Sequence, residues 1–299
     1  MKQQLLELLE KRMQQCVSDE RNSAMDKKLE RKKTIFAKRN AEIVKVKGKG
    51  KIDYIDLLQE VDEVYYTVHL QYFIKQLDSF YIEEEIEKRK GAFYKGILIE
   101  DKEIPICFPI EESNFSVEEE SLLEGDVVSD EEEQQKRRYT YDRLKAVQYA
   151  EKWWNSYNPA YKKFEVDCTN YISQCVRAGG GEMHGYPNRN KGWWMQNNNW
   201  SYSWSVANAF PRYLASSTKG LRAKEIKKAT DLLLGDVICY DFQGNGKYDH
   251  TTIVTGKDGN GEPLVNAHTY NSRMRYWKYE DSSAYTPNIK YRFFTILNN

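Results

Sequence analysis

The residue best placed for covalent chemistry is Cys168, which lies in the segment FEVDCTNYISQCVRAGGG at residues 164–181. Apolar side chains follow it at positions 171, 172, 175 and 176, a spacing that predicts one buried face of a helix. Asp167 is a favourable N-cap residue, and the glycines from Gly179 onward are expected to end the helix. Cys168 is therefore predicted in the first turn, where the helix dipole favours a thiolate and lowers the thiol pKa.

A thiol at this position can act as a nucleophile, and its own backbone N–H can face a developing oxyanion. The alternative is that Cys168 is a small core residue, as free cysteines usually are. Cys175, two turns further along the same face, and Cys239, within the strand-like segment VICYDF, fit that second interpretation.

A cysteine nucleophile needs a base, and two histidines are candidates. The segment YDHTTIV at residues 248–254 has the character of a strand, and DGNG at 258–261 predicts a hairpin turn into a return strand ending in His268. His250 and His268 are thus expected on neighbouring antiparallel strands, where their side chains could meet. We predict a Cys168–His250–His268 triad; Asn266, on the same strand face as His268, is a further candidate for the orienting group.

A metal site is the competing interpretation of the same residues. Cys168, Asp249, His250 and His268 could form a zinc set, but their spacing matches no zinc motif. We therefore predict no metal and no cofactor.

Aromatic residues are concentrated in KGWWMQNNNWSYSW at residues 191–204. This segment could line a substrate groove for a peptide or a sugar polymer, or it could cover the core with aromatic mass. The four candidates for the groove are Trp193, Trp194, Trp200 and Trp204.

The elements that must position these residues belong to an α+β chain of 299 residues, long enough for two domains. Residues 1–40 lack Pro and Gly and predict helix, whereas residues 41–110 predict short strands, with EVYYTVHLQYFI at 63–74 the clearest and Ala92–Ile99 the next. Together they predict a small N-terminal domain, a sheet with helix, over residues 1–110. His69 and Cys107 are interpreted as packing residues in it.

The segment between the two predicted domains is strongly acidic. Residues 111–135 hold 11 Asp and Glu and no Lys or Arg, and we interpret 111–138 as a linker. The second domain, 139–299, is predicted to begin with an amphipathic helix over 139–157 and contains all seven tryptophans.

Charge and hydropathy exclude several classes of protein. The 45 basic and 45 acidic side chains give a net charge of zero, which argues against nucleic acid as the main partner. No segment approaches the roughly 20 apolar residues of a membrane span. Charges occupy the place of the apolar region of a signal peptide, so we expect a cytoplasmic protein.

The short motifs DCTNYISQC, GDVICYD, DHTTIV and AHTYN, with Gly-Gly and YSW between the first two, follow one another in a familiar order. The order resembles the bacterial "putative amidase domain" family, grouped with papain-like cysteine hydrolases of the CHAP and NlpC type. The resemblance covers roughly residues 139–299. It implies a papain-like core in which Cys168 begins a helix packed on an antiparallel sheet, with His250 as base and His268 as orienting residue. Asp167 matches the acidic residue that precedes the nucleophile.

The activity implied by the resemblance is hydrolysis of a peptide or peptidoglycan amide through a thioester. Two alternatives use the same fold: a catalytically inert module that binds a cell-wall glycan or peptide, and acyl transfer to an amine. For the N-terminal domain, which has a separate composition, we expect a role in targeting or regulation.

Overall fold

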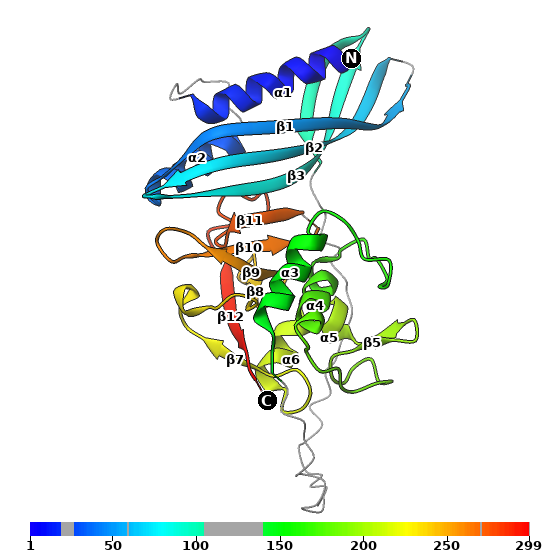
Figure 1. Ribbon diagram of the computed structural model, residues 1–299. Helices are drawn as coiled ribbons and strands as arrows, with labels where there is room; N and C mark the ends of the chain where they lie inside the picture. The colour runs from blue at the N-terminus through cyan, green and yellow to red at the C-terminus, as the bar shows by residue number, and fades with distance from the viewer. Residues whose placement is uncertain (19–26, 59, 105–139, 270, 299) are drawn as a thin grey trace, which may run out of the picture.

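The computed structural model describes residues 1–18, 27–58, 60–104, 140–269 and 271–298. The predicted linker at 111–138 and Cys107 lie outside these residues, as does the end of the region 41–110 predicted as strands. The described chain is α+β, as predicted, and is built around one large antiparallel sheet with helices packed on it (Figure 1). The strand order is β1-β2-β3-β11-β10-β9-β8-β12-β7, and β4 pairs with β3 at the side.

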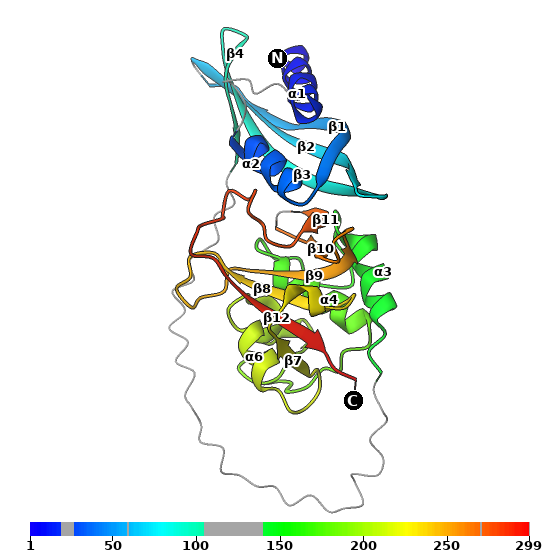
Figure 2. The same ribbon diagram turned by 90° about the vertical axis from the view of Figure 1, so that its left-hand side faces the viewer.

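The N-terminal part carries helices on one face of four strands (Figures 1 and 2). The helix predicted over 1–40 is two helices on either side of residues 19–26. The strand predicted at 92–99 is instead a turn between two strands, because Lys95 and Gly96 adopt positive φ angles of 48° and 78°. The elements are α1 (Lys2–Val17), α2 (Lys27–Lys38), β1 (Ala41–Asp56), β2 (Val61–Gln76), β3 (Ser79–Tyr94) and β4 (Ile97–Glu103).

The C-terminal part begins with α3 (Arg143–Trp153), shorter than the helix predicted over 139–157. Its Asp142 N-cap accepts a hydrogen bond from the backbone N–H of Lys145 at 3.0 Å, which fixes the start. The amphipathic pattern predicts Leu144, Val147, Ala150, Trp154 and Tyr157 on one buried stripe; Val147, Ala150 and Trp154 are buried, whereas Leu144 is 62% exposed and Ala146 is buried in addition. The other helices are α4 (Cys168–Ala178), α5 (Tyr202–Ser205) and α6 (Phe210–Ser216), with a short 3-10 turn, η2 (Ala229–Asp231).

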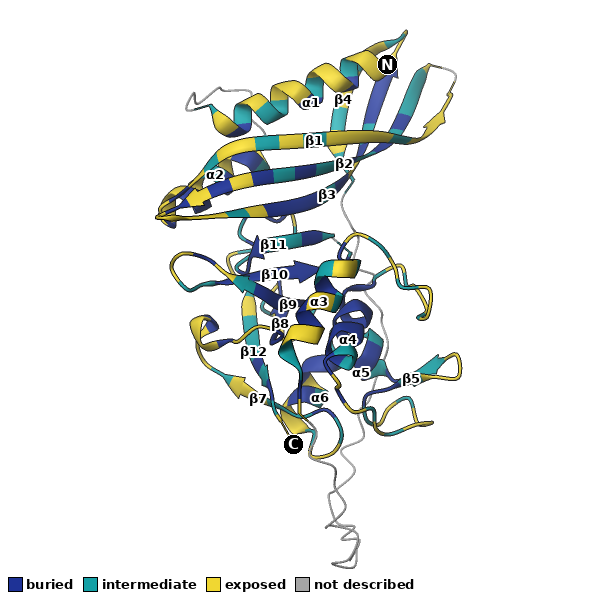
Figure 3. Ribbon diagram, viewed as in Figure 1, coloured by how far each residue is buried: buried dark blue, intermediate teal, exposed yellow. Residues whose placement is uncertain are grey.

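The two faces of the C-terminal strands are packed by different groups. Val237, Cys239 and Ile253 pack on the core of α3 and α4, while their strand neighbours Ile238 and Val254 belong to a second cluster on the opposite face. Figure 3 shows α4 largely buried, and its residues from Cys168 to Val176 are all buried. The strands are β7 (Ala223–Ile226), β8 (Val237–Asp241), β9 (His250–Lys257), β10 (Pro263–Ala267), β11 (Ser272–Tyr276) and β12 (Lys290–Ile296), with a separate pair, β5 (Met195–Gln196) and β6 (Asn199–Trp200).

The two parts share one sheet at the pairing of β3 with β11. Ser272 lies opposite Glu85 and Arg273 opposite Glu84, and the N–H of Ile86 donates to the carbonyl of Asn271 at 2.9 Å. The regions predicted as two domains are thus joined by main-chain hydrogen bonds between residues 84–86 and 271–273. None of the described helices is long and apolar enough to cross a membrane.

Candidate active site

The start of α4 brings together three of the predicted residues. Cys168 is the first residue of the helix and Asp167 its N-cap, as predicted. The Asp167 carboxylate makes no capping bond to the helix. It accepts from the backbone N–H of Phe164 at 3.0 Å and from the Asn170 amide at 2.8 Å, and its other oxygen lies 2.9 Å from Nδ1 of His268. The carboxylate therefore fixes His268 instead of the helix end.

The Cys168 side chain is buried, with 1% of its surface exposed. Its sulfur lies 3.8 Å from the hydroxyl of Thr169, which in turn lies 3.2 Å from the hydroxyl of Thr251 on β9. The backbone N–H of Cys168, expected to serve an oxyanion, donates to the hydroxyl of Thr269 at 3.2 Å. A substrate oxygen would have to replace that hydroxyl to use this donor.

Burial decides the protonation of Cys168. Burial raises the pKa of the Cys168 thiol, and the hydrogen bonds from Thr169 and Thr251, together with the helix start, do not overcome it; the charge of Asp167 raises the pKa further. The expectation that the helix position leaves this pKa lowered is therefore wrong. The physical reason is that desolvation of a fully buried thiolate exceeds the effect of a helix dipole.

His250 is the first residue of β9, and its ring is fully buried. The ring lies against Tyr240, Phe242 and Tyr279, which line the sheet face opposite α4. Its Nε2 is 3.3 Å from the hydroxyl of Tyr279. Burial, and then the positive charge of Arg275, lower the pKa of His250 to about 3, so the imidazole is neutral near pH 7.

His268 follows β10 and is also buried. Besides the contact of Nδ1 with Asp167, its Nε2 lies 2.7 Å from the carbonyl of Trp153, and its ring stacks on Tyr171 with centroids 3.9 Å apart. Both ring nitrogens thus face acceptors on other residues. Within the described chain, no hydrogen bond joins Cys168 to either histidine or His268 to His250.

Asn266 lies in β10 and is fully buried, away from the two histidines. Its carbonyl accepts from the hydroxyl of Thr255 and the backbone N–H of Met274, both at 2.8 Å. Its amide donates to Glu151 of α3 at 2.8 Å. These bonds tie α3 to the sheet, so the structure gives Asn266 a supporting role rather than contact with a base.

A shallow cleft of about 210 Å³, open solvent included, lies beside His268, between the end of α3, the following loop and α4. It is the surface hollow next to the start of α4. Its lining is polar and aromatic and includes Trp153, Tyr157, Lys162, Lys163, Asp167 and His268.

The tryptophans predicted to line a groove are largely enclosed. Trp193, Trp194 and Trp204 have 0% exposed surface, and the indole N–H of Trp204 donates to Asn170 at 2.9 Å. This favours the second interpretation, in which the segment covers the core. Trp200 is half-buried, next to Lys162, whose Nζ lies 4.7 Å from the ring centroid.

The sequence predicts Cys175, Cys239 and His69 as packing residues, and His69 also pairs with Glu84 at 2.7 Å. Cys175 and Cys239 are buried with reduced thiols, and His69 packs against Trp154 with ring centroids 5.5 Å apart. Over the ranges that the structure describes, no group of three or more His, Cys, Asp and Glu side chains is arranged to hold a metal ion.

Three residues at the site were not singled out from the sequence: Thr251, Thr269 and Tyr279. Thr251 and Thr269 each follow a predicted histidine directly, in DHT and AHT, so this repeated pattern could have revealed them. Tyr279 lies in WKYEDSS, where no periodicity or motif distinguishes it from the chain's other 21 tyrosines.

Comparison with known proteins gives a family and two relatives. Residues 140–294 match the family described as "Putative amidase domain". The chain is 50% identical over 278 residues to "Uncharacterized protein YhbB" of Bacillus subtilis (strain 168), covering 91% of this chain and 87% of that one. It is 32% identical over 140 residues to "Uncharacterized protein YjcM" of the same organism, covering 44% of this chain and 31% of that one. No solved structure gives a significant match.

Proposed function

Because this chain belongs to the "Putative amidase domain" family, we propose that it is a cysteine amidase or peptidase that hydrolyses an amide through a thioester. Cys168 is the nucleophile and His250 the base. The fold of residues 140–294 is then papain-like, with α4 as the helix that carries the nucleophile.

The observation that carries this proposal is the contact between α4 and the start of β9. The sulfur of Cys168 lies 3.8 Å from the hydroxyl of Thr169, and that hydroxyl lies 3.2 Å from the hydroxyl of Thr251, the residue directly after His250. The Tyr279 hydroxyl lies 3.3 Å from Nε2 of His250, on the sheet face opposite α4. The thiol thus approaches the start of β9 from the α4 side, and the imidazole leaves the same point of the strand on the other face.

The resting pair is a neutral thiol and a neutral imidazole, as the pKa shifts of both groups indicate. In the proposed reaction the ring of His250 turns around the end of β9 and takes the proton of Cys168 as sulfur bonds to the amide carbon. The C–N bond then breaks, and the amine leaves with the proton from His250. Water, deprotonated by His250, hydrolyses the thioester and releases the carboxylic acid and the thiol.

The substrate class we propose is a peptide or peptidoglycan amide. The cleft beside His268 offers aromatic rings, amide groups and two lysines, which suit a polar chain with carboxylates. In this account the His268–Asp167 pair forms the part of the cleft lining that lies next to Cys168. The Thr269 hydroxyl occupies the position that the substrate carbonyl oxygen takes when it accepts the backbone N–H of Cys168.

The test is a comparison of two cysteine variants on one helix. Cys168→Ala should abolish release of amine or new carboxylate from peptidoglycan fragments and amide libraries, whereas Cys175→Ala, which removes a buried thiol two turns further along, should keep activity. Hydrolysis that survives in Cys168→Ala would reject the proposed nucleophile.

A second candidate, an inert module that binds a cell-wall glycan or peptide, is favoured by one observation. Cys168 and His250 are almost completely enclosed, and burial disfavours the thiolate. Retention of intact peptidoglycan fragments by wild type and Cys168→Ala alike, without turnover, would support this alternative. Acyl transfer uses the same residues as hydrolysis, and an amide product formed with an added amine would identify it.

A further inference from the structure

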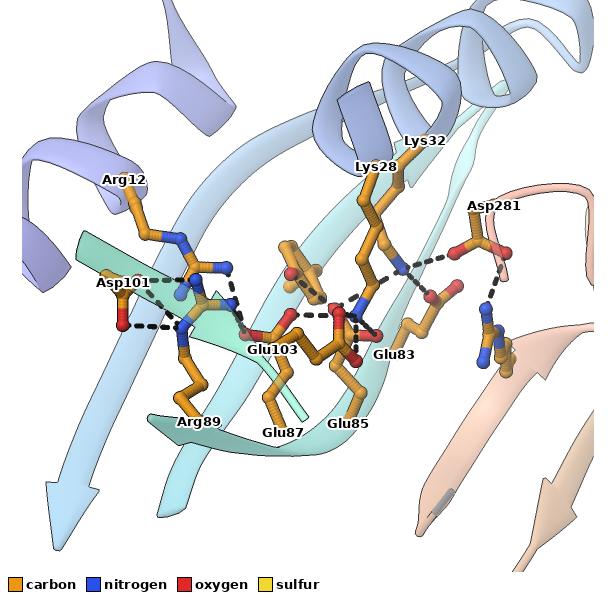
Figure 4. A network of polar contacts seen from close by, with 12 residues as sticks. Arg12, Lys28, Lys32, Glu83, Glu85, Glu87, Arg89, Asp101, Glu103 and Asp281 are labelled. Atoms are coloured by element: carbon orange, nitrogen blue, oxygen red, sulfur yellow. Dashed lines mark hydrogen bonds and ion pairs between the residues drawn. The ribbon is translucent and has the colours of Figure 1, made fainter. Parts of the chain in front are cut away.

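A line of buried polar contacts runs from α2 in the N-terminal part to the imidazole of His250. The Lys32 ammonium pairs with Glu83 and lies 3.1 Å from Asp281 (Figure 4). The other oxygen of Asp281 lies 2.7 Å from the guanidinium of Arg275 on β11. The Lys32, Asp281 and Arg275 side chains are at most 9% exposed.

The same line continues to the candidate base. The guanidinium carbon of Arg275 lies 4.2 Å from the ring centroid of Tyr279, a cation–π contact with its face. The Tyr279 hydroxyl lies 3.2 Å from Ser272 and 3.3 Å from Nε2 of His250. Tyr279 is thus held by two residues of β11, and His250 is held by Tyr279.

β11 is itself fixed by the N-terminal sheet. Its only neighbours among the described strands are β10 and β3, and the β3 ladder runs through Ser272 and Arg273. Arg273 also pairs with Glu84 of β3 at 2.9 Å. The register that places Ser272 and Arg275 under Tyr279 is therefore set partly by residues before position 104.

The buried carboxylate of Asp281 is stabilised by the cations on either side of it. Asp281 is buried between two cations, Lys32 and Arg275, and these hold its pKa well below the usual range despite burial. Removing Lys32 leaves Asp281 with a single buried cation, and Arg275 then compensates the carboxylate alone. In Lys32→Met the Arg275 guanidinium is the remaining cation next to the Asp281 carboxylate. We therefore expect it to shift toward Asp281 and away from Tyr279.

We propose that the N-terminal part completes the candidate active site, with Lys32, Asp281 and Arg275 acting as positioning residues for His250 through Tyr279. This inference rests on the proposed function, in which His250 is the base. It gives the N-terminal part a role inside the reaction rather than in targeting. Among the described residues, the titratable or charged groups that face His250 include Tyr240 of β8, and Tyr279 and Arg275 on the β11 side.

The test uses two lysine variants of the full-length chain. Lys32→Met removes the cation next to Asp281. Lys28→Met removes a cation from the same helix, one turn away, which pairs with Glu87 of β3 and Glu103 of β4 and lies 3.5 Å from Glu85, but does not contact Asp281. Two measurements are made: the ¹⁵N chemical shifts of the His250 ring at neutral pH, assigned with His250→Gln, and the rate at which iodoacetamide labels Cys168.

We expect Lys32→Met to change the His250 Nε2 shift and to slow labelling of Cys168 roughly tenfold, because a small misplacement of a base is costly. Lys28→Met should leave the shift in place and the labelling rate within about twofold, although it also loses a buried cation. Lys32→Arg should restore both properties. If Lys32→Met does not fold, Lys32→Gln, which keeps a donor for Asp281, is measured instead with the same expectation of slower labelling.

Equal effects of the two lysine variants, or an unchanged His250 shift in Lys32→Met, would overturn the inference. The ring shift does not depend on hydrolysis, so the two proposals fail separately. A wild-type protein without hydrolase activity but with a Lys32-dependent His250 shift would refute the function alone. An active enzyme indifferent to Lys32 would refute the positioning role alone.

Discussion

The N-terminal and C-terminal parts of the sheet are both covered by helices on one face, but they fill the space below the helices differently. Under α4 the filling is apolar, with Ile172, Val176 and Ile253 all at 0% exposure. Under α1 and α2, an apolar cluster that includes Leu9, Phe36 and Val68 lies beside a row of carboxylates on the middle of β3, and Arg12, Lys28 and Lys32 reach these carboxylates from the helices (Figure 4). The row consists of Glu83, Glu85 and Glu87.

The apolar packing of the C-terminal part and the buried ion pairs of the N-terminal part contribute differently to the structure. An apolar core tolerates no water and fixes the backbone that holds Cys168. Buried ion pairs add little net stability, but a buried charge without its partner is strongly destabilising. The pairs therefore fix the register of β3 and, through β3, that of β11. The charged region is thus suited to positioning, and the apolar region to rigidity.

The largest effect is expected in the apolar core. Trp204→Ala should destabilise the protein by about 3–5 kcal/mol, because loss of a fully buried indole leaves a large cavity and removes the donor to the side-chain oxygen of Asn170. The free energy of unfolding in urea measures it. Leu144→Ala, at an exposed site of α3, should change it by less than about 0.5 kcal/mol. A cost below about 1 kcal/mol for Trp204→Ala would mean that this core is not tightly packed.

The next effect concerns the charged region. Glu87 lies 2.9 Å from Arg12, 2.7 Å from Lys28 and 3.0 Å from Arg89. Glu87→Leu should cost about 3 kcal/mol, since three cations lose a buried partner. Glu100→Gln, which breaks an exposed pair with Lys102 on β4, should cost less than about 1 kcal/mol. Equal values for the two variants, measured by urea unfolding, would remove the distinction between buried and surface pairs.

The third prediction concerns how the free energy of unfolding depends on pH through His250, which lies in the C-terminal part. The pKa of His250 is about 3 in the folded chain and about 6.5 in an unfolded one, so the unfolded state binds the extra proton between those values. Stability should therefore fall as pH drops from about 6.5 toward 3, by at most about 1.4 kcal/mol per pH unit from this group.

Urea unfolding at several pH values from 7 to 4 measures this slope in wild type and in His250→Gln. The variant should lose stability less steeply, because the carboxylates of the charged region are common to both proteins. Parallel slopes would show that His250 is not held in its neutral form by the fold.

The sequence was most informative where local patterns determine structure. The apolar spacing after Asp167 and the glycines at its end predicted α4, and DGNG predicted the hairpin between β9 and β10. The predicted chemistry of Cys168 was less complete. The position of Cys168 at a helix start could be predicted from the sequence. Its burial could not, because it depends on Thr251, Thr269 and strands that lie about a hundred residues away.

The joining of the two parts could not be read from the chain. The pairing of β3 with β11 links residues almost 190 positions apart, and no local pattern specifies it. The two acceptors of His268 illustrate the same limit. Asp167 lies in a motif, whereas the other acceptor is the backbone carbonyl of Trp153, which no side-chain pattern marks.

The central claim is that Cys168 is a nucleophile served by His250, and its most direct measurement needs no substrate. Iodoacetamide labelling of each cysteine is followed by peptide mapping from pH 6 to 10 in wild type and His250→Ala. The account predicts that Cys168 is labelled faster than the equally buried Cys175 and Cys239, and at least tenfold more slowly in His250→Ala near pH 7.5. A Cys168 that reacts as slowly as those two thiols and ignores the mutation would contradict it.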